Sequence, residues 1–228
     1  MDFEVYHSSS TANLYSVESD GSKLLIEAGL RGSHLKQALN YGLTSFQGCL
    51  ASHVHGDHSK GCKDVLNAGV DLYITKETKE DLKLNSHRVH IIEPLKQFKI
   101  DNWLIMPFPT EHDCPGSVGF LIEKDNEKLV FLTDSYYCKY KFKRLNVIAI
   151  ECNWSHKTLD PNLEEVVKQR LFKSHFNLER VCEFLLANDL RMVREIHLLH
   201  LSDRNSDEVM FRRTVQKLTG IPTYVAGK

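Results

Sequence analysis

The chain has 228 residues, of which 42% are hydrophobic, and its formal net charge is −1. This length and composition suffice for a hydrophobic core, and no repeat, low-complexity tract or Pro/Gly-rich linker interrupts the sequence. We therefore predict a single domain over residues 1–228. Because the charge is near zero, no global basic field points to a polyanion partner, which weakens long nucleic acid as a substrate without excluding it.

The first half of the chain alternates between strand-like and helix-like segments. Strands are expected at residues 3–6, 14–17, 23–26, 48–52 and 72–74. Helices are expected at 33–41, 60–68 and 75–82.

The second half continues the alternation. Strands are expected at 89–92, 103–108, 118–122, 129–132, 147–151 and 195–199, with a hairpin turn at Asn126. Helices are expected at 163–171, at 178–188 after Asn177 as the N-cap, and at 206–218. This alternation predicts an α/β fold in which helices pack outside layered sheets.

The cysteines and the N-terminal segment indicate in which cellular compartment the protein is expected. Six cysteines occur without a C-x-x-C pair or a regular spacing, at Cys49, Cys62, Cys114, Cys138, Cys152 and Cys182. The segment after Met1 has no basic and then apolar signal pattern, and no apolar run approaches the length of a membrane span. We therefore expect a cytoplasmic protein with reduced thiols and no membrane contact.

Residues 53–58 carry the strongest chemical signal, because they read His-x-His-x-Asp-His. Three imidazoles and a carboxylate within six residues make a poor core segment, since each buried polar group needs a partner. They directly follow the apolar segment 49–51, so we expect them to be presented at the end of a strand. Imidazole and carboxylate together suit zinc, manganese or iron.

Three more polar residues end apolar segments. His112 follows the strand expected at 103–108, Asp134 ends the run 129–133, and His200 ends the run 196–199. Alone, a strand-ending aspartate usually caps a turn and a single histidine is usually a surface or core residue. Because all three lie at strand ends, we predict that they join residues 53–58 in one metal site.

This ordered set of residues resembles the ligand motifs of the metallo-β-lactamase fold superfamily. Over most of the chain the sequence is most similar to the YycJ-type (WalJ) exonuclease family, and more distantly to tRNase Z. The resemblance implies a four-layer αβ/βα sandwich of two mixed β-sheets with helices outside. It also implies a site at one sheet edge for two divalent ions, Zn²⁺ or Mn²⁺. The implied ligands are His53, His55 and His112 for the first ion, Asp57, His58 and His200 for the second, and Asp134 as the bridge.

His175 resembles the accessory histidine of the nucleolytic branches of this superfamily, which contacts the scissile phosphate and helps to protonate the leaving oxygen. An alkoxide is a poor leaving group, so an acid with a pKa near neutrality assists its departure. A thioester needs less help, and His175 therefore favours phosphodiester cleavage. The alternative is that His175 only begins a helix. We expect Asp57 and His175 to be the catalytic residues.

The resemblance also implies residues that surround the substrate. The family places an N-terminal loop near the site, usually with the sequence Ser-Gly-Ser-Ser-Gly-Asn, whereas residues 7–13 here read His-Ser-Ser-Ser-Thr-Ala-Asn. Glu27 replaces an aspartate that usually supports the histidine loop, and we expect the same support from it. The candidate substrate contacts are Ser9, Asn13, Asn153, Asn177 and Ser202.

A basic and aromatic segment at 136–144 has two interpretations. It contains Lys139, Lys141, Lys143 and Arg144 between Tyr136, Tyr137, Tyr140 and Phe142. Such residues hold a nucleotide strand through phosphate contacts and base stacking. They equally form a solvated loop with packed aromatic side chains.

We therefore predict a dinuclear metal-dependent phosphodiesterase or nuclease that hydrolyses DNA or nucleotides through attack by a metal-bound hydroxide. A cyclic-nucleotide phosphodiesterase, as in phage proteins that act against cyclic-nucleotide immunity, is the first alternative. A glyoxalase II-like thioesterase is the second, and a non-catalytic metal-bound sensor or scaffold is the third. We expect a nucleic acid or nucleotide substrate, with a homodimer as one alternative for the assembly. The exact substrate, native metal and strand polarity are left open.

Overall fold

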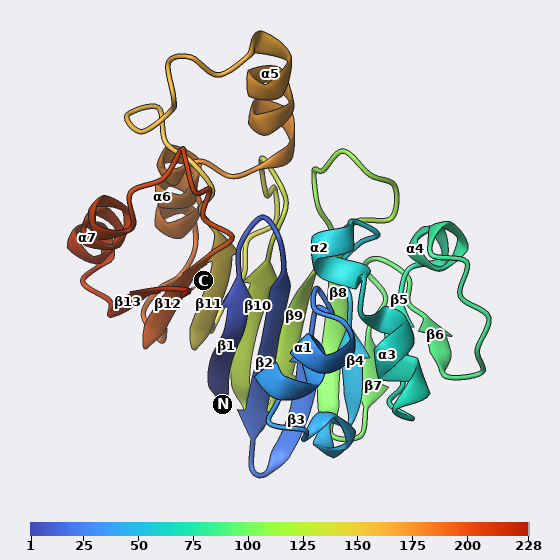
Figure 1. Ribbon diagram of the computed structural model, residues 1–228. Helices are drawn as coiled ribbons and strands as arrows, with labels where there is room; N and C mark the ends of the chain where they lie inside the picture. The colour runs from blue at the N-terminus through green and yellow to red at the C-terminus, as the bar shows by residue number, and fades with distance from the viewer. Residues whose placement is uncertain (228) are drawn as a thin grey trace.

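Two β-sheets pack face to face in the computed structural model, which describes residues 1–227 (Figure 1). The first sheet has six strands in the order β1-β2-β3-β4-β5-β6. Its first three strands are antiparallel, and the strands from β3 to β6 are parallel. Their bounds are β1 Asp2–Ser8, β2 Asn13–Ser19, β3 Ser22–Ile26, β4 Gly48–Leu50, β5 Leu72–Ile74 and β6 Val89–Ile91.

The second sheet has seven strands in the order β13-β12-β11-β10-β9-β8-β7. The four strands from β10 to β13 are parallel, and β9, β8 and β7 continue the sheet in antiparallel pairs. Their bounds are β7 Phe98–Ile100, β8 Trp103–Pro109, β9 Val118–Lys124, β10 Glu127–Leu132, β11 Val147–Glu151, β12 Glu195–Leu199 and β13 Thr223–Val225. Both sheets are therefore mixed, as predicted.

Strand alternation divides the apolar side chains between inner and outer layers. Leu24 of β3 and Phe131 of β10 belong to the cluster between the sheets. Their neighbours along the strands point outward, so Leu25 packs in the outer cluster of the first sheet and Val130 in that of the second. Since both faces of each sheet are covered, the central strands are apolar on both sides.

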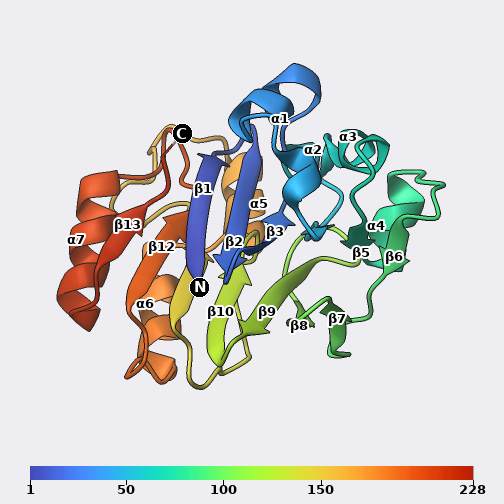
Figure 2. The same cartoon turned by 90° about the horizontal axis from the view of Figure 1, so that it is seen from below.

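Helices cover the two outer faces and complete the four predicted layers (Figure 2). Leu35 of α1 and Val65 of α3 pack on the first sheet, and Val181 of α6 and Phe211 of α7 pack on the second. The helices are α1 Gly32–Ala38, α2 Gly56–Ser59, α3 Cys62–Asn67, α4 Lys76–Asp81, α5 Glu165–Ser174, α6 Leu178–Ala187 and α7 Glu208–Thr219, with a 3₁₀ turn at Leu43–Ser45. Asn177 caps α6 as predicted, because its side chain accepts a hydrogen bond from the Arg180 backbone N–H.

The structure differs from the predicted elements in a few places. The helix expected at 60–68 is replaced by α2 and α3, and α2 begins inside the histidine motif. The chain breaks at Gly61, where an added Cβ would lie 1.8 Å from the Leu30 carbonyl oxygen, so only glycine allows this close approach. Two three-residue strands, β7 and β13, were not expected, since each is defined by pairing with a neighbour rather than by its own pattern.

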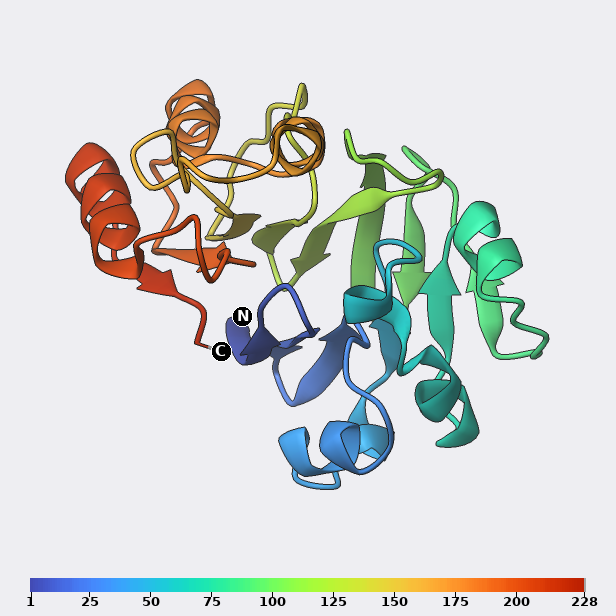
Figure 3. The same ribbon diagram turned by 45° about the horizontal axis from the view of Figure 1, so that its top comes forward.

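The strand directions bring several loops to one edge of the molecule. Strands β8, β10, β11 and β12 run in the same direction in the second sheet, so their carboxyl ends meet there. The end of β4 joins them from the first sheet, because the Val118 N–H donates to the Ser52 carbonyl oxygen. Helix α5 (amber) and helix α2 (cyan) lie on opposite sides of this edge (Figure 3).

Among residues 1–227, no helix combines the length and the apolar character needed to span a bilayer.

Gly29 allows the histidine motif to lie close to the backbone of the first sheet, so a substitution at this position should destabilise the fold. A Cβ at Gly29 would lie 1.9 Å from the Asp57 carbonyl oxygen and 2.4 Å from the Asn13 backbone nitrogen. We expect Gly29→Ala to destabilise the fold by about 2 kcal/mol or more, because packed backbone must shift. Urea unfolding of the metal-free protein measures this. Gly56→Ala is the matched control, since nothing lies within 4 Å of its added Cβ; equal stability of the two variants would contradict the prediction.

Candidate metal centre

The seven predicted ligands converge at this edge under an open pocket of about 440 Å³. Four of them follow β4 within residues 53–58, and the others follow β8, β10 and β12 at His112, Asp134 and His200. The pocket is lined by His55, Asp57, His112, Asp134, His175 and His200, among others. The strand ends therefore bring together residues that lie up to 147 positions apart in the sequence, from 53 to 200.

His53, His55 and His112 form the first donor group. The Nε2 atom of His53 lies 3.2 Å from Nδ1 of His55, and Nε2 of His112 lies 3.1 Å from the same Nδ1. Zn–N bonds of about 2.0–2.1 Å at tetrahedral angles would separate two ligand nitrogens by roughly 3.3 Å. The nitrogens thus already have the spacing that a shared cation requires.

Hydrogen bonds on the far side of the rings orient this group. Nδ1 of His112 lies 3.0 Å from the Ser174 carbonyl oxygen, and Nδ1 of His53 lies 2.8 Å from Ser52 Oγ. A carbonyl oxygen can only accept, so Nδ1 of His112 is the protonated nitrogen and its Nε2 is free to donate a lone pair to a metal. Burial first, and then the positive neighbour His58, lowers the pKa of His53 well below its ordinary value, which keeps that imidazole neutral as a ligand must be.

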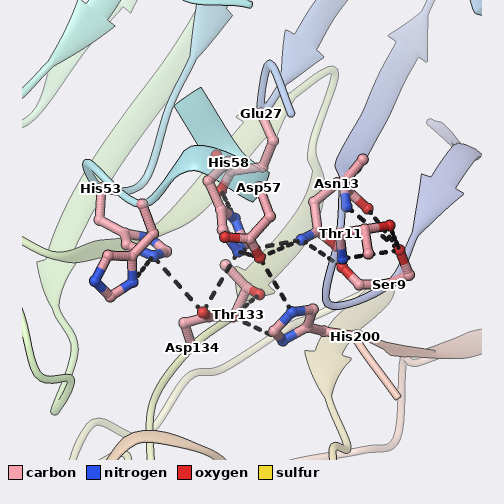
Figure 4. Close-up of polar contacts among 12 residues, drawn as sticks. Ser9, Thr11, Asn13, Glu27, His53, Asp57, His58, Thr133, Asp134 and His200 are labelled. Carbon is pink, nitrogen blue, oxygen red and sulfur yellow. Dashed lines mark hydrogen bonds and ion pairs between the residues drawn. The ribbon is translucent and has the colours of Figure 1, made fainter. Parts of the chain in front are cut away.

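Asp57, His58 and His200 form the second donor group, with Asp134 between the two groups (Figure 4). Asp57 Oδ2 lies 3.1 Å from His58 Nε2 and 3.4 Å from His200 Nε2. The Asp134 Oδ2 atom lies 3.6 Å from Nε2 of His53 and 3.4 Å from Nε2 of His58, so one oxygen faces both groups. This is the position that a bridging carboxylate would occupy.

The electrostatics of the second group also fit a cation. Asp134 is only 2% exposed, and burial opposes its ionisation, but His200 and His58 outweigh this and lower its pKa. His200 Nε2 is buried and has no hydrogen-bond partner within residues 1–227. In the metal-free chain His58 and His200 balance these buried carboxylates, and a divalent ion would supply that positive charge in their place.

The backbone at several strand-end residues is left-handed, and this directs their side chains toward the site. Asp134 has φ 42° and His200 has φ 53°, values that residues other than glycine rarely adopt. Glu27, at the end of β3, has φ 65°. Such conformations cost about 1–3 kcal/mol each and persist where the surrounding contacts impose them.

Glu27 supports the histidine motif, as predicted. Its side chain is fully buried, Oε2 accepts a hydrogen bond from the Ser52 backbone N–H at 3.2 Å, and Oε1 lies 3.5 Å from His58 Nδ1. The longer side chain therefore reaches the loop that the usual aspartate would support.

Glu151 is a central residue that the sequence interpretation missed. Its Oε1 atom lies 2.5 Å from His175 Nδ1 and 3.0 Å from His200 Nδ1, and its Oε2 atom accepts hydrogen bonds from the Ser135 and Phe176 backbone N–H groups. Burial opposes its ionisation, but His175 outweighs this and lowers the pKa of Glu151. Glu151 ends the apolar strand β11, so the criterion that identified Asp134 would also have found it.

Cys114 is the second residue that was missed. Its thiol lies with the first donor group, where the candidate ligand atoms are within 4.8 Å of one another. Burial raises the pKa of this thiol to about 11. Its only sequence signal is its place two residues after His112.

The five candidate substrate contacts lie around the donors rather than on the wall of the 440 Å³ pocket. Asn13 is fully buried, and its amide nitrogen lies 3.3 Å from Asp57 Oδ2. Ser9 accepts hydrogen bonds from the backbone of its own loop. Asn153 donates to the His200 carbonyl oxygen, and Ser202 accepts from the Asn205 backbone N–H. Asn177 caps α6 and lines a separate cavity, whereas the other four support the loops. The role of all five as substrate contacts stays a prediction.

The basic and aromatic segment 136–144 does not line the pocket over the donors. Phe142 is buried in the core cluster of the second sheet, and Tyr140 packs against that cluster. Tyr137, Lys139 and Lys141 instead line a neighbouring cavity with Arg180. The segment is therefore partly a packed loop and partly the wall of this neighbouring cavity.

This fold and this donor set are those of metal-dependent hydrolases built on the metallo-β-lactamase fold. The chain belongs to that superfamily, because residues 23–200 match the family model described as a beta-lactamase superfamily domain. The predicted fold and superfamily are thus confirmed.

Three known proteins illustrate the similarity. The exodeoxyribonuclease WalJ of Streptococcus pneumoniae is 25% identical over 231 residues, which cover 93% of this chain and 86% of that protein. The exodeoxyribonuclease YycJ of Bacillus anthracis is 26% identical over 239 residues, which cover 95% and 88%. The metallo-β-lactamase fold protein YhfI of Bacillus subtilis aligns structurally with a TM-score of 0.79 at 14% identity over 99% of this chain and 97% of that one.

Metal analysis tests the two donor groups separately. We expect about two zinc or manganese ions per chain, about one in His53→Ala or His200→Ala, and weaker binding of both in Asp134→Ala, since that carboxylate faces both groups. Plasma mass spectrometry and calorimetric titration measure this. His34→Ala, an exposed histidine outside the site, is the control. A wild-type chain that binds only one ion, or an Asp134→Ala chain that binds both normally, would contradict the assignment.

Proposed function

We propose that this protein is a dinuclear metal-dependent phosphodiesterase that hydrolyses DNA as an exodeoxyribonuclease. The observation that carries the proposal is the position of His175, which lines the pocket over the donors while a buried carboxylate holds its far nitrogen. Two relatives of exodeoxyribonuclease activity, similar over nearly the whole chain, support the choice of DNA.

His175 has the geometry of a proton donor. Its ring lies near those of both His112 and His200, with centroid distances of 5.6 and 5.4 Å. Glu151 accepts from Nδ1, which leaves Nε2 as the nitrogen available to a substrate. Although burial opposes protonation, the Glu151 carboxylate outweighs it and raises the pKa of His175, which favours the protonated ring.

The remaining roles follow from the same geometry. Metal ions bound by the two groups would supply a water of lowered pKa and positive charge beside the phosphate. Asp57 and Asp134 orient their histidine partners and would balance the charge of bound ions. His175 then protonates the leaving oxygen, the step that a phosphodiester with an alkoxide leaving group needs most.

A substrate panel tests the reaction class. The manganese- and zinc-loaded protein is incubated with bis-p-nitrophenyl phosphate, 5′-phosphorylated duplex DNA, cyclic mononucleotides and a glutathione thioester. We expect hydrolysis of the first two, and Asp57→Ala should lose at least about 100-fold in rate because the second donor group is broken. Hydrolysis of the thioester alone would sink the proposal, and turnover of cyclic nucleotides alone would replace DNA by that substrate.

The acid role of His175 predicts a dependence on the leaving group. His175→Ala should lower kcat on DNA by about 10²–10⁴-fold, the usual contribution of a positioned acid. On bis-p-nitrophenyl phosphate the loss should be much smaller, because nitrophenolate departs without protonation. Steady-state kinetics on both substrates measure this, with His34→Ala as the control. Equal losses on the two substrates would mean that His175 only maintains the structure.

A further inference from the structure

A further hollow beside the pocket over the donors also has His175 in its wall. Its volume is about 160 Å³, and its wall is formed by Trp154, His156, Phe172, His175, Asn177 and Arg180. The pocket over the donors and this hollow share His175 as a lining residue, so the two spaces are neighbours. We call this further hollow the aromatic cavity.

Three rings form one wall of the aromatic cavity. Trp154 stacks on Phe172 with a centroid distance of 4.6 Å and an interplanar angle of 22°, and His156 packs edge-on against Trp154 at 4.9 Å. Trp154 is almost fully buried, whereas Phe172 is half-buried and His156 is exposed. Ring surface of Phe172 and His156 therefore remains accessible beside the cavity.

Two polar residues also line the cavity, and contacts within the fold hold both in place. The Arg180 guanidinium lies over the Tyr136 ring at 5.3 Å and donates from Nη1 to the Tyr136 carbonyl oxygen, so its plane is held in place. The Asn177 side chain caps α6. Trp154 donates from Nε1 to the His175 carbonyl oxygen at 3.3 Å, which ties the ring wall directly to the proposed proton donor.

The chemistry of these walls suits a flat heteroaromatic group. Aromatic rings stack on any nucleobase through their π faces, and an immobilised guanidinium adds a cation and planar donors. The volume is below the roughly 300–1,000 Å³ of pockets that enclose a whole drug-sized ligand, so it suits one base rather than a complete nucleotide.

We propose that the aromatic cavity binds the base of the nucleoside that leaves on the far side of the scissile bond. This inference rests on the proposed function, because His175 protonates the leaving oxygen and the cavity begins at the same ring. The departing 3′- or 5′-oxygen would lie at His175, the base would stack beside Phe172 and Trp154, and the phosphate would remain at the donor groups.

Tryptophan fluorescence tests the cavity without requiring turnover. The chain has two tryptophans, and Trp103 is fully buried at the start of β8, so a ligand in the cavity should quench Trp154. The metal-loaded protein is titrated with adenosine and, separately, with ribose. We expect saturable quenching by adenosine and none by ribose. Equal responses to both, or no response to adenosine, would overturn the inference.

Two variants separate binding from packing. Phe172→Leu keeps apolar volume but removes the ring, and Arg180→Gln removes the planar cation; each should weaken adenosine binding by about five-fold or more. Val166→Ala, on the same helix but 80% exposed, is the matched control and should bind normally. Unchanged affinity in both cavity variants would overturn the inference. Thermal unfolding checks that all three variants remain folded.

The same protein preparations distinguish the two proposals. If bis-p-nitrophenyl phosphate and DNA are hydrolysed but adenosine does not quench, the aromatic cavity is not a base subsite and the proposed function stands. If adenosine quenches and no phosphodiester is hydrolysed, a base-binding cavity is supported and both the leaving-group role and the proposed function fall.

Discussion

The burial of Asp134 and Glu151 at the ends of two adjacent parallel strands is the constraint on which the rest of this site depends. Both carboxylates are almost completely removed from water, and each needs positive charge or hydrogen-bond donors around it. Asp134 faces both donor groups, and Glu151 faces His175 and His200. The histidines supply positive charge and hydrogen-bond donors to these carboxylates, and the implied metal ions would supply further positive charge.

Asp134 and Glu151 contact different groups, and this difference explains the organisation of the site. The Asp134 oxygen lies where two ions would share a ligand, so it controls the spacing of the donor groups. Glu151 holds the outer nitrogens of His175 and His200, so it couples the proposed acid to the second donor group. In the proposed function, one β-strand separation would therefore set the distance between the phosphate and the proposed proton donor.

His175 also marks the boundary between two kinds of surface. On one side lie charged donors suited to a phosphate, and on the other lie rings and a guanidinium suited to a base. The cavity formed by Tyr137, Lys139, Lys141 and Arg180 continues from the second surface, since Arg180 lines both hollows. Specificity in such a fold resides in these walls, because many members share the donor set while their walls differ.

The sequence by itself predicted the candidate donor residues and the class of fold. Four candidate donors lie within residues 53–58 and the others follow apolar strands, so local spacing and strand ends singled them out, while their assignment to two ions came from the family resemblance. The strand-end position of Glu151 is visible in the sequence, but the contacts of Glu151, the place of Cys114 beside the first donor group and the aromatic cavity were decided only by the tertiary structure. Glu151 joins His175 and His200 across 24 and 49 positions, and Trp154 meets Phe172 across a loop and a helix. Such contacts depend on how strands and helices pack, which no local pattern encodes.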